Sequence, residues 1–546
     1  MKIVVIGGVA AGASAAAKAR RTDEHAEIII LEQGEYVSFA NCGLPYYVGG
    51  TIEDRDDLIL VSPELFRDRY HIDVRLQHKV TSFNAAEKVV CGTCPEGEFE
   101  EHYDKLILAM GGEPIRPPMP GSDLPGVYNV FTVPDVDEIM LALGDGVKKA
   151  VVVGGGFIGV ETAEELLKRH VDTTLVELAP QLLGNFDKEF SPPIERHLES
   201  LGLHICLGKS LTEVRGEGRV QKAVLSDGTV LDTDMVILAV GVRPRVSLAK
   251  EAGVRLGETG GILVDGGMRT NLPDVFAAGD IVESLHLVSR KKVKIPLAGS
   301  ANKQGRVAGA NAAGGNMLFR GVLGTAIIKA GELSCGRTGL SEKEVKALGL
   351  SYQVAWLPSN SNASYYPTAE TLIVKLIFET PTGRILGAQA IGRQGVDKRI
   401  DVFSTAMMGN LTVFDLENLD LAYAPPFGSA KDPVIMIGMV AANVLRGQEK
   451  LITAEAALSA AKEDPNAVIL DVRTQEEYDE GHLDGAVLLP VDELRGRLQE
   501  LDRKKRYLVT CRVGARAWLA CCILQQNGFS AENITGGWLG HTMELD

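Results

Sequence analysis

The feature that most constrains the fold is the segment Gly-Gly-Gly-Phe-Ile-Gly at residues 154–159, which fits the pattern G-x-G-x-x-G. The apolar run at residues 151–153 predicts a buried strand before it, and a helix is predicted to follow to about Lys168. A second strand over residues 174–176 ends at Glu177. This order predicts a β-α-β unit that binds a dinucleotide.

Each glycine of the motif has its own task in such a unit. Gly154 makes the tight turn, Gly156 lets the backbone approach the pyrophosphate, and Gly159 lets the helix pack on the strand. The helix N-terminus offers unpaired N–H groups to the phosphates. Glu177 is predicted to accept hydrogen bonds from the ribose hydroxyls and to repel a 2′-phosphate. No arginine follows it in residues 178–181, which favours NADH over NADPH.

A second, weaker unit of this kind opens the chain. A strand over residues 2–6, the glycine turn at residues 7–12 and an alanine-rich helix are followed by a strand that ends at Glu32. Valine takes the place of the middle glycine, whereas Gly7 and Gly12 are kept. The same residues imitate a signal peptide, but a cleavable leader has no need of the second strand and its acidic end.

Length and charge limit the class of protein. A chain of 546 residues is too long for one ordinary core, so we expect several domains. A net charge of −16 argues against a nucleic-acid partner. Eight cysteines are too few for a disulfide scaffold and predict a reduced, cytoplasmic protein. No apolar run approaches the roughly 20 residues that cross a bilayer.

The C-x-x-C at residues 91–94 lacks a second ligand pair, so we predict a hairpin turn and no metal site.

Two further motifs connect the chain to a family. Ala109-Met110-Gly111-Gly112 and Ala278-Gly279-Asp280, together with both glycine units, resemble the flavoprotein disulfide reductases with two dinucleotide-binding domains, over residues 1 to about 446. The resemblance implies FAD in the first domain, with Asp280 on the ribityl chain. It also implies a helix near residues 296–300 that points at the flavin, and a homodimer formed through residues 319–446. Met110 stands where the family usually has threonine.

The C-terminal part of the chain carries a different set of motifs. The strand at residues 468–473, Gly481-His482, the loop at residues 511–516 and Gly536-Gly537-Trp538 resemble a rhodanese domain. The expected fold class is α/β, with two Rossmann-like FAD- and NAD-binding domains, an α+β dimerisation domain and an α/β rhodanese domain. The predicted bounds are FAD-binding 1–112 and 241–318, NAD-binding 113–240, dimerisation 319–446, linker 447–452 and rhodanese 453–546.

Cys42 is the first of two single thiols. Tyr47 stands where a disulfide reductase of the usual kind carries its second cysteine, so Cys42 is expected to cycle with a sulfur from outside the chain. A single cysteine of this kind is, by default, a core thiol. Residues 38–47 nevertheless resemble coenzyme A-disulfide reductases and their rhodanese-fused relatives, the NADH-dependent persulfide reductases. NADH oxidases and peroxidases share the single cysteine and cycle it through sulfenic acid.

Cys511 is the second. A predicted helix over residues 515–525 follows its loop, and the backbone N–H groups with Arg512, Gly514 and Arg516 would stabilise a thiolate and then a persulfide. Related phosphatases need one more residue between cysteine and arginine, whereas this shorter loop fits a sulfur atom. The alternative is an inert docking domain, which normally comes with loss of the cysteine.

The family resemblance also implies a coenzyme A site. Tyr366 or Tyr365, with Tyr423, would close the pocket from the partner subunit, and a tyrosine hydroxyl would protonate the departing thiolate. Glu161 would border the nicotinamide, unless it is only an acid at the helix start. A solvated face is the alternative for the polar set on the first helix. The predicted coenzyme A residues are Ser14, Lys18, Arg21, Ser38, Asn41, Asn302, Tyr365 and Lys431.

These inferences predict an NADH- and FAD-dependent persulfide reductase that acts on coenzyme A persulfide or a similar small persulfide. Cys511 would relay sulfane sulfur to Cys42. A coenzyme A-disulfide or polysulfide reductase is the alternative enzyme. A sulfur-carrier or redox-sensing flavoprotein is the alternative of another class.

Overall fold

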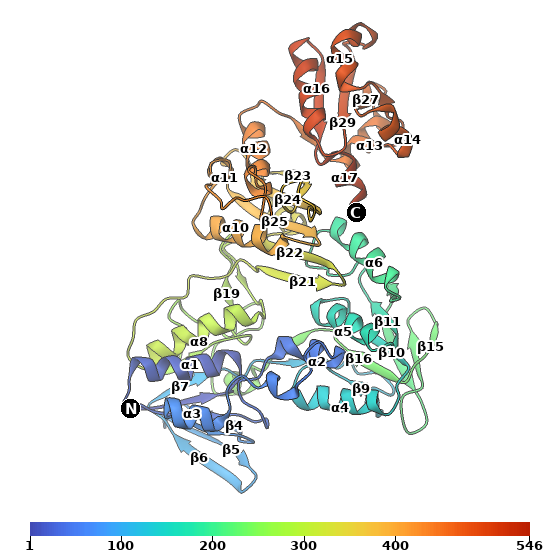
Figure 1. Ribbon diagram of the computed structural model, residues 1–546. Coiled ribbons are helices and arrows are strands. Elements are labelled where there is room, and N and C mark those ends of the chain that lie inside the picture. Colours follow the sequence, from blue (N-terminus) through green and yellow to red (C-terminus); the bar gives the residue numbers. More distant parts are fainter. Residues whose placement is uncertain (546) are drawn as a thin grey trace. The chain divides into compact units, whose positions relative to one another are not determined.

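The structure, a computed structural model, describes residues 1–545 (Figure 1). The chain forms two compact units. The first comprises Met1–Gly184 and Leu198–Val322, and the second comprises Asn185–His197 with the chain from Leu323 onward. The predicted mixed α/β class is confirmed, and so are both glycine-rich β-α-β units and the rhodanese-like unit.

The first nucleotide-binding domain has a five-stranded sheet in the order β18-β7-β1-β2-β3. β1 (Lys2–Ile6) lies between β2 (Glu27–Leu31) and β7 (Lys105–Leu108), and both pairings are parallel. The strand order reverses between β1 and β7, which is where open α/β sheets bind ligands at the strands' carboxyl ends. Its other elements are β3 (Asp73–Arg75), β18 (Val275–Ala277), α2 (Leu44–Gly49), α3 (Pro63–Tyr70), α7 (Ser247–Glu251) and the antiparallel β4 (Lys79–Asn84), β5 (Val89–Cys94) and β6 (Gly97–His102).

Helices α1 (Ala10–Thr22) and α8 (Ala298–Ala312) run side by side (Figure 1). Their close contact requires glycine, because a Cβ at Gly305 would come within 2.1 Å of the carbonyl oxygen of Ala11. Two segments about 290 residues apart in the sequence are therefore brought to one cofactor edge. The predicted helix opening near residues 296–300 is confirmed as α8.

The second nucleotide-binding domain repeats the arrangement in the order β12-β11-β10-β16-β9. β10 (Lys149–Val153) pairs in parallel with β11 (Asp172–Glu177) and β16 (Met235–Leu238), and α5 (Phe157–Lys168) follows the glycine motif. The predicted strand and helix ends at Glu177 and Lys168 are confirmed. The other elements are β9 (Val127–Tyr128), α4 (Val133–Gly144), α6 (Ser191–Ser200), β12 (His204–Leu207), β13 (Leu211–Arg215), β14 (Lys222–Leu225), β15 (Val230–Asp232), and the pair β8 (Gly112–Pro114) and β17 (Val242–Pro244).

The second unit contains an antiparallel sheet in the order β21-β22-β25-β24-β23. Every residue of β25 is buried, and the middle of β24 is buried on both faces. The elements are β21 (Ala326–Ala330), β22 (Leu333–Gly339), α9 (Glu342–Ala347), β23 (Tyr352–Asn360), β24 (Thr371–Glu379), β25 (Ile385–Gly392), α10 (Val396–Met408), α11 (Val413–Leu416) and α12 (Pro433–Leu445).

The C-terminal sheet is parallel, in the order β26-β30-β29-β27-β28. β26 (Leu451–Ile452) pairs with β30 (Ser530–Ile534), so the sheet begins inside the segment predicted as linker, residues 447–452. The other elements are α13 (Ala454–Glu463), β27 (Ala467–Asp471), α14 (Gln475–Glu480), β28 (Val487–Leu488), α15 (Val491–Arg497), β29 (Arg506–Thr510), α16 (Ala515–Gln526) and α17 (Gly537–Thr542).

The C-x-x-C segment and the apolar helices are the last features of the fold that bear on the sequence predictions. The C-x-x-C lies on β5, and residues 95–96 form the turn into β6, so the predicted hairpin is confirmed. Within residues 1–545, no helix combines the length and the apolar character that crossing a bilayer requires.

Candidate active site

Cys42 lies in a short 3₁₀ turn, Asn41–Gly43, directly before α2. The Ser38 backbone N–H donates to the Gly8 carbonyl oxygen at 2.9 Å, which fixes this segment to the glycine loop after β1. The Cys42 side chain is exposed, and no cysteine within residues 1–545 forms a disulfide. The thiol is therefore presented at the end of β1 without an intrachain partner.

Both glycine motifs fold as dinucleotide cradles. A Cβ at Gly12 would lie 1.8 Å from the Gly7 carbonyl oxygen, and a Cβ at Gly159 would lie 1.8 Å from that of Gly154. Helix and turn can approach so closely only without a side chain. A Cβ at Gly156 would meet nothing within 4 Å, so the backbone there is open to a ligand.

The two acids that end the second strands have matching surroundings. The Glu32 carboxylate accepts hydrogen bonds from the N–H groups of Gly8 and Gly34, each at 2.8 Å. The Glu177 carboxylate accepts from the N–H groups of Gly155 and, at 2.6 Å, Ala179. These bonds hold each carboxylate beside its glycine loop, where the ribose of a dinucleotide is bound in this fold.

The helix N-termini of both nucleotide-binding domains and Asp280 of the first also fit bound cofactors. Helices α1, α5 and α8 begin without a side-chain cap, whereas Ser62 and Thr132 cap α3 and α4. Uncapped N-termini leave N–H groups for phosphate or ring oxygens. Asp280 is half-buried, burial raises the pKa of its carboxyl, and it forms no hydrogen bond or ion pair within residues 1–545. Such a carboxylate suits a hydroxyl-bearing ligand.

A buried acid lies beside the thiol segment. Tyr46 on α2 donates its hydroxyl to Oε1 of Glu161 on α5 at 3.2 Å. Burial raises the pKa of Glu161, the Tyr46 hydrogen bond opposes this, and the charges of Glu164 and Glu165 add to the rise, so that the pKa lies at about 7. Lys168 pairs with Glu164 and Glu165, at 3.0 and 2.6 Å, but no cation pairs with Glu161 within residues 1–545. Glu161 can therefore change its charge near neutral pH.

The charge of Glu161 acts on the thiol. Desolvation raises the pKa of Cys42 above its ordinary value, and the negative charges of Glu161 and Asp280 raise it further. A thiol next to two carboxyls becomes a thiolate more easily when either carboxyl is neutral or compensated.

Further contacts clamp α2 on α5. Thr51 Oγ1 donates to Glu165 Oε2 at 3.0 Å, and Arg169 Nε donates to the Val48 carbonyl oxygen at 3.0 Å. Glu161 could be predicted from the sequence as a site residue, whereas its partner Tyr46 was not predicted. Tyr46 lies within residues 38–47, the segment matched to the coenzyme A-disulfide reductases, and this was the available signal.

Some predicted coenzyme A residues come together. Ser14 Oγ donates to Asn302 Oδ1 at 2.6 Å, which joins α1 to α8. The Arg21 guanidinium lies over the Tyr70 ring, 5.4 Å from its centroid, so Tyr70 holds a cation. Lys18 is half-buried, and the Asn41 amide instead donates to the Phe131 carbonyl oxygen at 3.3 Å.

The predicted tyrosines lie in the second unit. The hydroxyls of Tyr365 and Tyr423 are 3.2 Å apart, and this hydrogen bond raises the pKa of Tyr365. Tyr365 is 74% exposed and Tyr423 is 48% exposed. The hydrogen bond thus pairs Tyr423 with Tyr365, and the neighbouring Tyr366 is half-buried. Lys431, which follows Tyr423 in the sequence, is exposed.

The Cys511 loop is closed by backbone groups. Cys511 is fully buried, and the Gly514 N–H donates to its Sγ at 3.1 Å. The N–H of Trp538 on α17 donates to the Cys511 carbonyl oxygen at 2.8 Å. Arg516 forms a two-pronged ion pair with Glu477, both bonds at 2.6 Å, whereas Arg512 is exposed. Within residues 1–545, the Gly514 N–H thus lies on the sulfur, and the Arg512 side chain has no partner and can meet a ligand.

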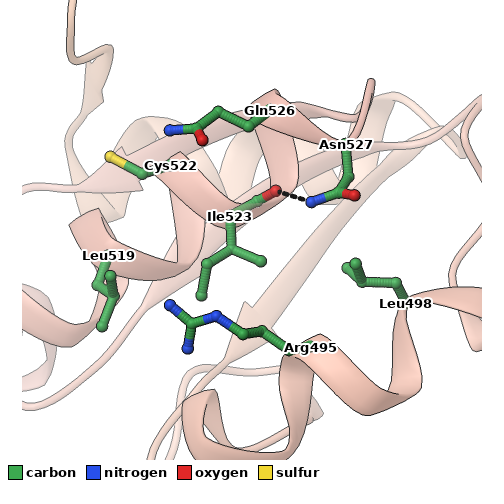
Figure 2. A pocket seen from close by; sticks show the side chains of 7 residues that line it. All are labelled: Arg495, Leu498, Leu519, Cys522, Ile523, Gln526 and Asn527. Atoms are coloured by element: carbon green, nitrogen blue, oxygen red, sulfur yellow. Dashed lines mark hydrogen bonds between the residues drawn. The ribbon is translucent and has the colours of Figure 1, made fainter.

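A cavity of about 390 Å³ lies between α15 and α16 (Figure 2). It contains none of the predicted site residues. Its lining residues are Arg495, Leu498, Leu519, Cys522, Ile523, Gln526 and Asn527.

The chain combines two dinucleotide-binding folds, a free cysteine beside the first glycine loop, and a C-terminal domain with a cysteine in a short loop after a strand. These features define a thiol-dependent oxidoreductase fused to a rhodanese-like domain. The chain belongs to the pyridine nucleotide-disulphide oxidoreductases, whose family model matches residues 1–305. The dimerisation domain of that family matches residues 325–433, and a rhodanese-like domain matches residues 454–543. FAD and a pyridine nucleotide are the cofactors of an enzyme of this family.

Similar proteins cover all or most of this chain. Reduced CoADR-RHD of Bacillus anthracis is 40% identical with a TM-score of 0.96, covering 99% of this chain and 97% of that one. The NAD-dependent persulfide reductase of A. fulgidus is 38% identical with a TM-score of 0.92, covering 99% of both chains. The CoA-dependent NAD(P)H sulfur oxidoreductase of Pyrococcus furiosus is 37% identical, over 80% of this chain and 98% of its own length.

Proposed function

We propose that this protein reduces small persulfides, coenzyme A persulfide above all, with electrons from NADH. The observation that carries the proposal is Cys42, a single thiol held beside the FAD glycine loop with no cysteine partner in the described chain. The names of its relatives, a persulfide reductase and a CoA-dependent sulfur oxidoreductase, support the same substrate class.

The thiol chemistry follows from one nucleophile. The Cys42 thiolate attacks the inner sulfur of the persulfide R–S–SH, forms the mixed disulfide Cys42–S–S–R and releases HS⁻. Two electrons and one proton then return Cys42 to the thiolate and release R–SH. When bound, FAD supplies the two-electron chemistry that connects NADH to this bond. The sum is RSSH + NADH → RSH + HS⁻ + NAD⁺.

Tyr365 and Tyr423 would supply the proton for R–SH. Because both phenols are exposed and hydrogen-bonded to each other, we propose that a homodimer forms and that this pair closes the Cys42 site of the other subunit. The match to the family's dimerisation domain supports this assembly.

Cys511 would bring sulfur to the site. The Gly514 N–H stabilises negative charge on its sulfur, and exposed Arg512 can attract an anionic donor. We propose that Cys511 accepts sulfane sulfur as a persulfide and passes it to coenzyme A, and that the resulting coenzyme A persulfide reacts at Cys42. Ser14, Asn302 and Arg21 lie on the two helices at the cofactor edge and would hold its nucleotide end.

Two substitutions test this division of labour. Cys42→Ser is expected to abolish NADH consumption with every persulfide, whereas Cys511→Ser keeps the reduction of coenzyme A persulfide and loses sulfur uptake from larger donors. Equal loss in both variants would contradict the relay. Turnover on coenzyme A persulfide, coenzyme A disulfide and polysulfide separates the proposed activity from its closest alternatives. A stoichiometric persulfide adduct without turnover would indicate a carrier or sensor.

A further inference from the structure

A single buried carboxyl lies in the otherwise exposed connection between α12 and the rhodanese sheet. Residues 446–448 and Lys450 are exposed, whereas Glu449 is only 4% exposed. The Asn533 backbone N–H donates to the Lys450 carbonyl oxygen at 2.8 Å, and Leu451 pairs with Asn533 where β26 joins β30. Strand pairing therefore carries this acid into the interior of the domain.

Glu449 is connected to the sulfur loop through one side chain. The Asn533 amide Nδ2 donates to Glu449 Oε1 at 2.7 Å and to the Gly514 carbonyl oxygen at 3.3 Å. Gly514 in turn donates its N–H to Cys511 Sγ at 3.1 Å. A continuous chain of hydrogen bonds thus runs from Glu449 to the reactive sulfur.

The same two side chains contain two buried atoms that have no hydrogen-bond partner among residues 1–545, Glu449 Oε2 and Asn533 Oδ1. Both are acceptors when the carboxyl is ionised, and burying an unpaired acceptor is unfavourable. A proton on Oε2 turns it into a donor, and Oδ1 is an acceptor on the same amide that already bonds Oε1. The carboxylic acid and the amide can then form a two-bond ring that leaves neither atom unpaired.

We propose that Glu449 is held as a protonated carboxylic acid that donates through Oε2 to Oδ1 of Asn533, and that this acid–amide pair positions the loop of Cys511. Glu449 is a positioning residue, because it acts on the sulfur only through Asn533 and Gly514. The functional consequence rests on the proposed role of Cys511 as a sulfur carrier.

The electrostatic surroundings agree with this assignment. Burial raises the pKa of Glu449 and the hydrogen bond from Asn533 opposes it, so that the pKa lies at about 7; no cation within the described residues 1–545 pairs with this carboxyl. From α16 the thiols Cys521 and Cys522 face it, and its ionised form raises the pKa of both. On β30, Glu532 acts on Cys521 as well, but Arg506 pairs with it at 2.7 Å.

The proton on Glu449 determines how sulfur transfer by Cys511 depends on pH. Below the pKa of Glu449 the acid–amide ring is intact and the loop is held. Above it, the bond to Oδ1 is lost and a negative charge stands behind a loop that must stabilise a persulfide anion. Sulfur transfer by Cys511 is therefore expected to fall as the pH rises through about 7.

Glu449→Gln is the matched variant, because glutamine can accept from Asn533 Nδ2 and donate to Oδ1 at every pH. The probe is sulfur transfer from thiosulfate to cyanide by the full-length holoprotein. The Cys511 thiolate takes the outer sulfur and releases sulfite, and cyanide removes that sulfur as thiocyanate. The variant-to-wild-type rate ratio should stay near one at mildly acid pH and reach about tenfold one unit above the pKa. A ratio independent of pH overturns the proposal.

Infrared spectroscopy and a second substitution provide further tests of the acid–amide pair. Infrared difference spectra should contain the carbonyl stretch of a protonated carboxyl that Glu449→Gln removes, and its absence overturns the assignment whatever the activity. Asn533→Asp places a second carboxyl beside Glu449 and should shift the midpoint of the pH profile, so an unchanged midpoint also contradicts the pair. If the wild type forms no thiocyanate at any pH, the role of Cys511 fails, and the infrared band still decides the protonation of Glu449.

Discussion

Tyr46 donates a hydrogen bond to Glu161 at 3.2 Å, and this bond joins the helix after Cys42 to the helix of the second nucleotide motif. A change in the charge of Glu161 is thereby coupled to the segment that presents the thiol. Because the pKa of Glu161 is about 7, the coupling operates near neutral pH.

Glu161→Gln should make Cys42 more reactive. Removing this charge lowers the pKa of the Cys42 thiol, since Glu161 is one of the two carboxyls that raise it. At neutral pH we expect alkylation of Cys42 by iodoacetamide to be about threefold faster or more. Peptide mass spectrometry of the labelled cysteine measures the rate.

Tyr46→Phe is the control for that effect. It removes the hydrogen bond that lowers the pKa of Glu161, so Glu161 keeps its proton to higher pH and alkylation accelerates less than in Glu161→Gln. Slower alkylation in both variants would contradict the coupling.

The phenol pair predicts a contrast between adjacent tyrosines. Tyr365→Phe and Tyr423→Phe should each lower kcat with a small persulfide by about 10²-fold, the scale of a lost general acid. Tyr366→Phe is the matched control and should stay within about threefold of wild type, because its neighbour carries the hydrogen bond to Tyr423. Steady-state NADH oxidation measures all three, and a larger loss in Tyr366→Phe would assign the acid to that residue instead.

Coenzyme choice should depend on Glu177. Its carboxylate is fixed beside the second glycine loop by two backbone N–H groups, where it would repel a 2′-phosphate. Glu177→Gln should raise kcat/KM for NADPH relative to NADH by about tenfold, or 1.4 kcal/mol. Parallel titrations with both coenzymes measure the ratio. An unchanged ratio means that another residue selects the coenzyme.

A stability prediction concerns the buried Lys375, which is 0% exposed. Its ammonium lies 2.9 Å from Asp187, 2.9 Å from Glu342 and 5.0 Å from the centre of the Trp356 ring. Lys375→Met removes the cation that pairs with buried Asp187 and one of the two cations that pair with Glu342, and it should cost about 3–5 kcal/mol. Lys346→Met, which removes a surface partner of Glu342, should cost at most about 0.5 kcal/mol. Chemical unfolding followed by tryptophan fluorescence compares the two, and equal losses would refute the role of burial.

The cluster around Lys375 also predicts how the free energy of unfolding changes as the pH falls. Burial alone would raise the pKa of Glu342, but the Lys375 charge and hydrogen bonds from Lys346, Lys375 and Tyr352 lower it to about 2. A carboxyl with a lowered folded-state pKa stabilises the fold above its ordinary pKa of 4.5 and loses that contribution as the pH falls towards 2. The loss between these values should be smaller in Lys375→Met, and an equal loss would contradict the assignment.

The local elements could be predicted because their causes are local. The strands ending at Ile6 and Val153, the uncapped helices after the glycines, and the hairpin at residues 95–96 follow from periodicity and turn chemistry within short windows. Cys42, Cys511, Glu32 and Glu177 could be singled out from the sequence for the same reason, because each lies in or beside such a short motif.

The contacts that tune these groups were not predictable in this way. Tyr46 and Glu161 are 115 residues apart, and Asn533 and Glu449 are 84 apart. The choice of Tyr365 over its neighbour as the partner of Tyr423 also depends on how two distant loops meet. Nothing in the residue types fixes these pairs, because each becomes a pair only when separate elements pack.

The amino-acid order by itself therefore determined which motifs this protein carries: two dinucleotide-binding glycine loops, the Cys42 segment and the rhodanese-like loop of Cys511, each encoded in a short stretch. Only the tertiary structure decided the protonation states around them. Burial of Glu161 and Glu449 between elements far apart in the chain raises both carboxyl pKa values to about 7, since a charge removed from water without a cation is costly.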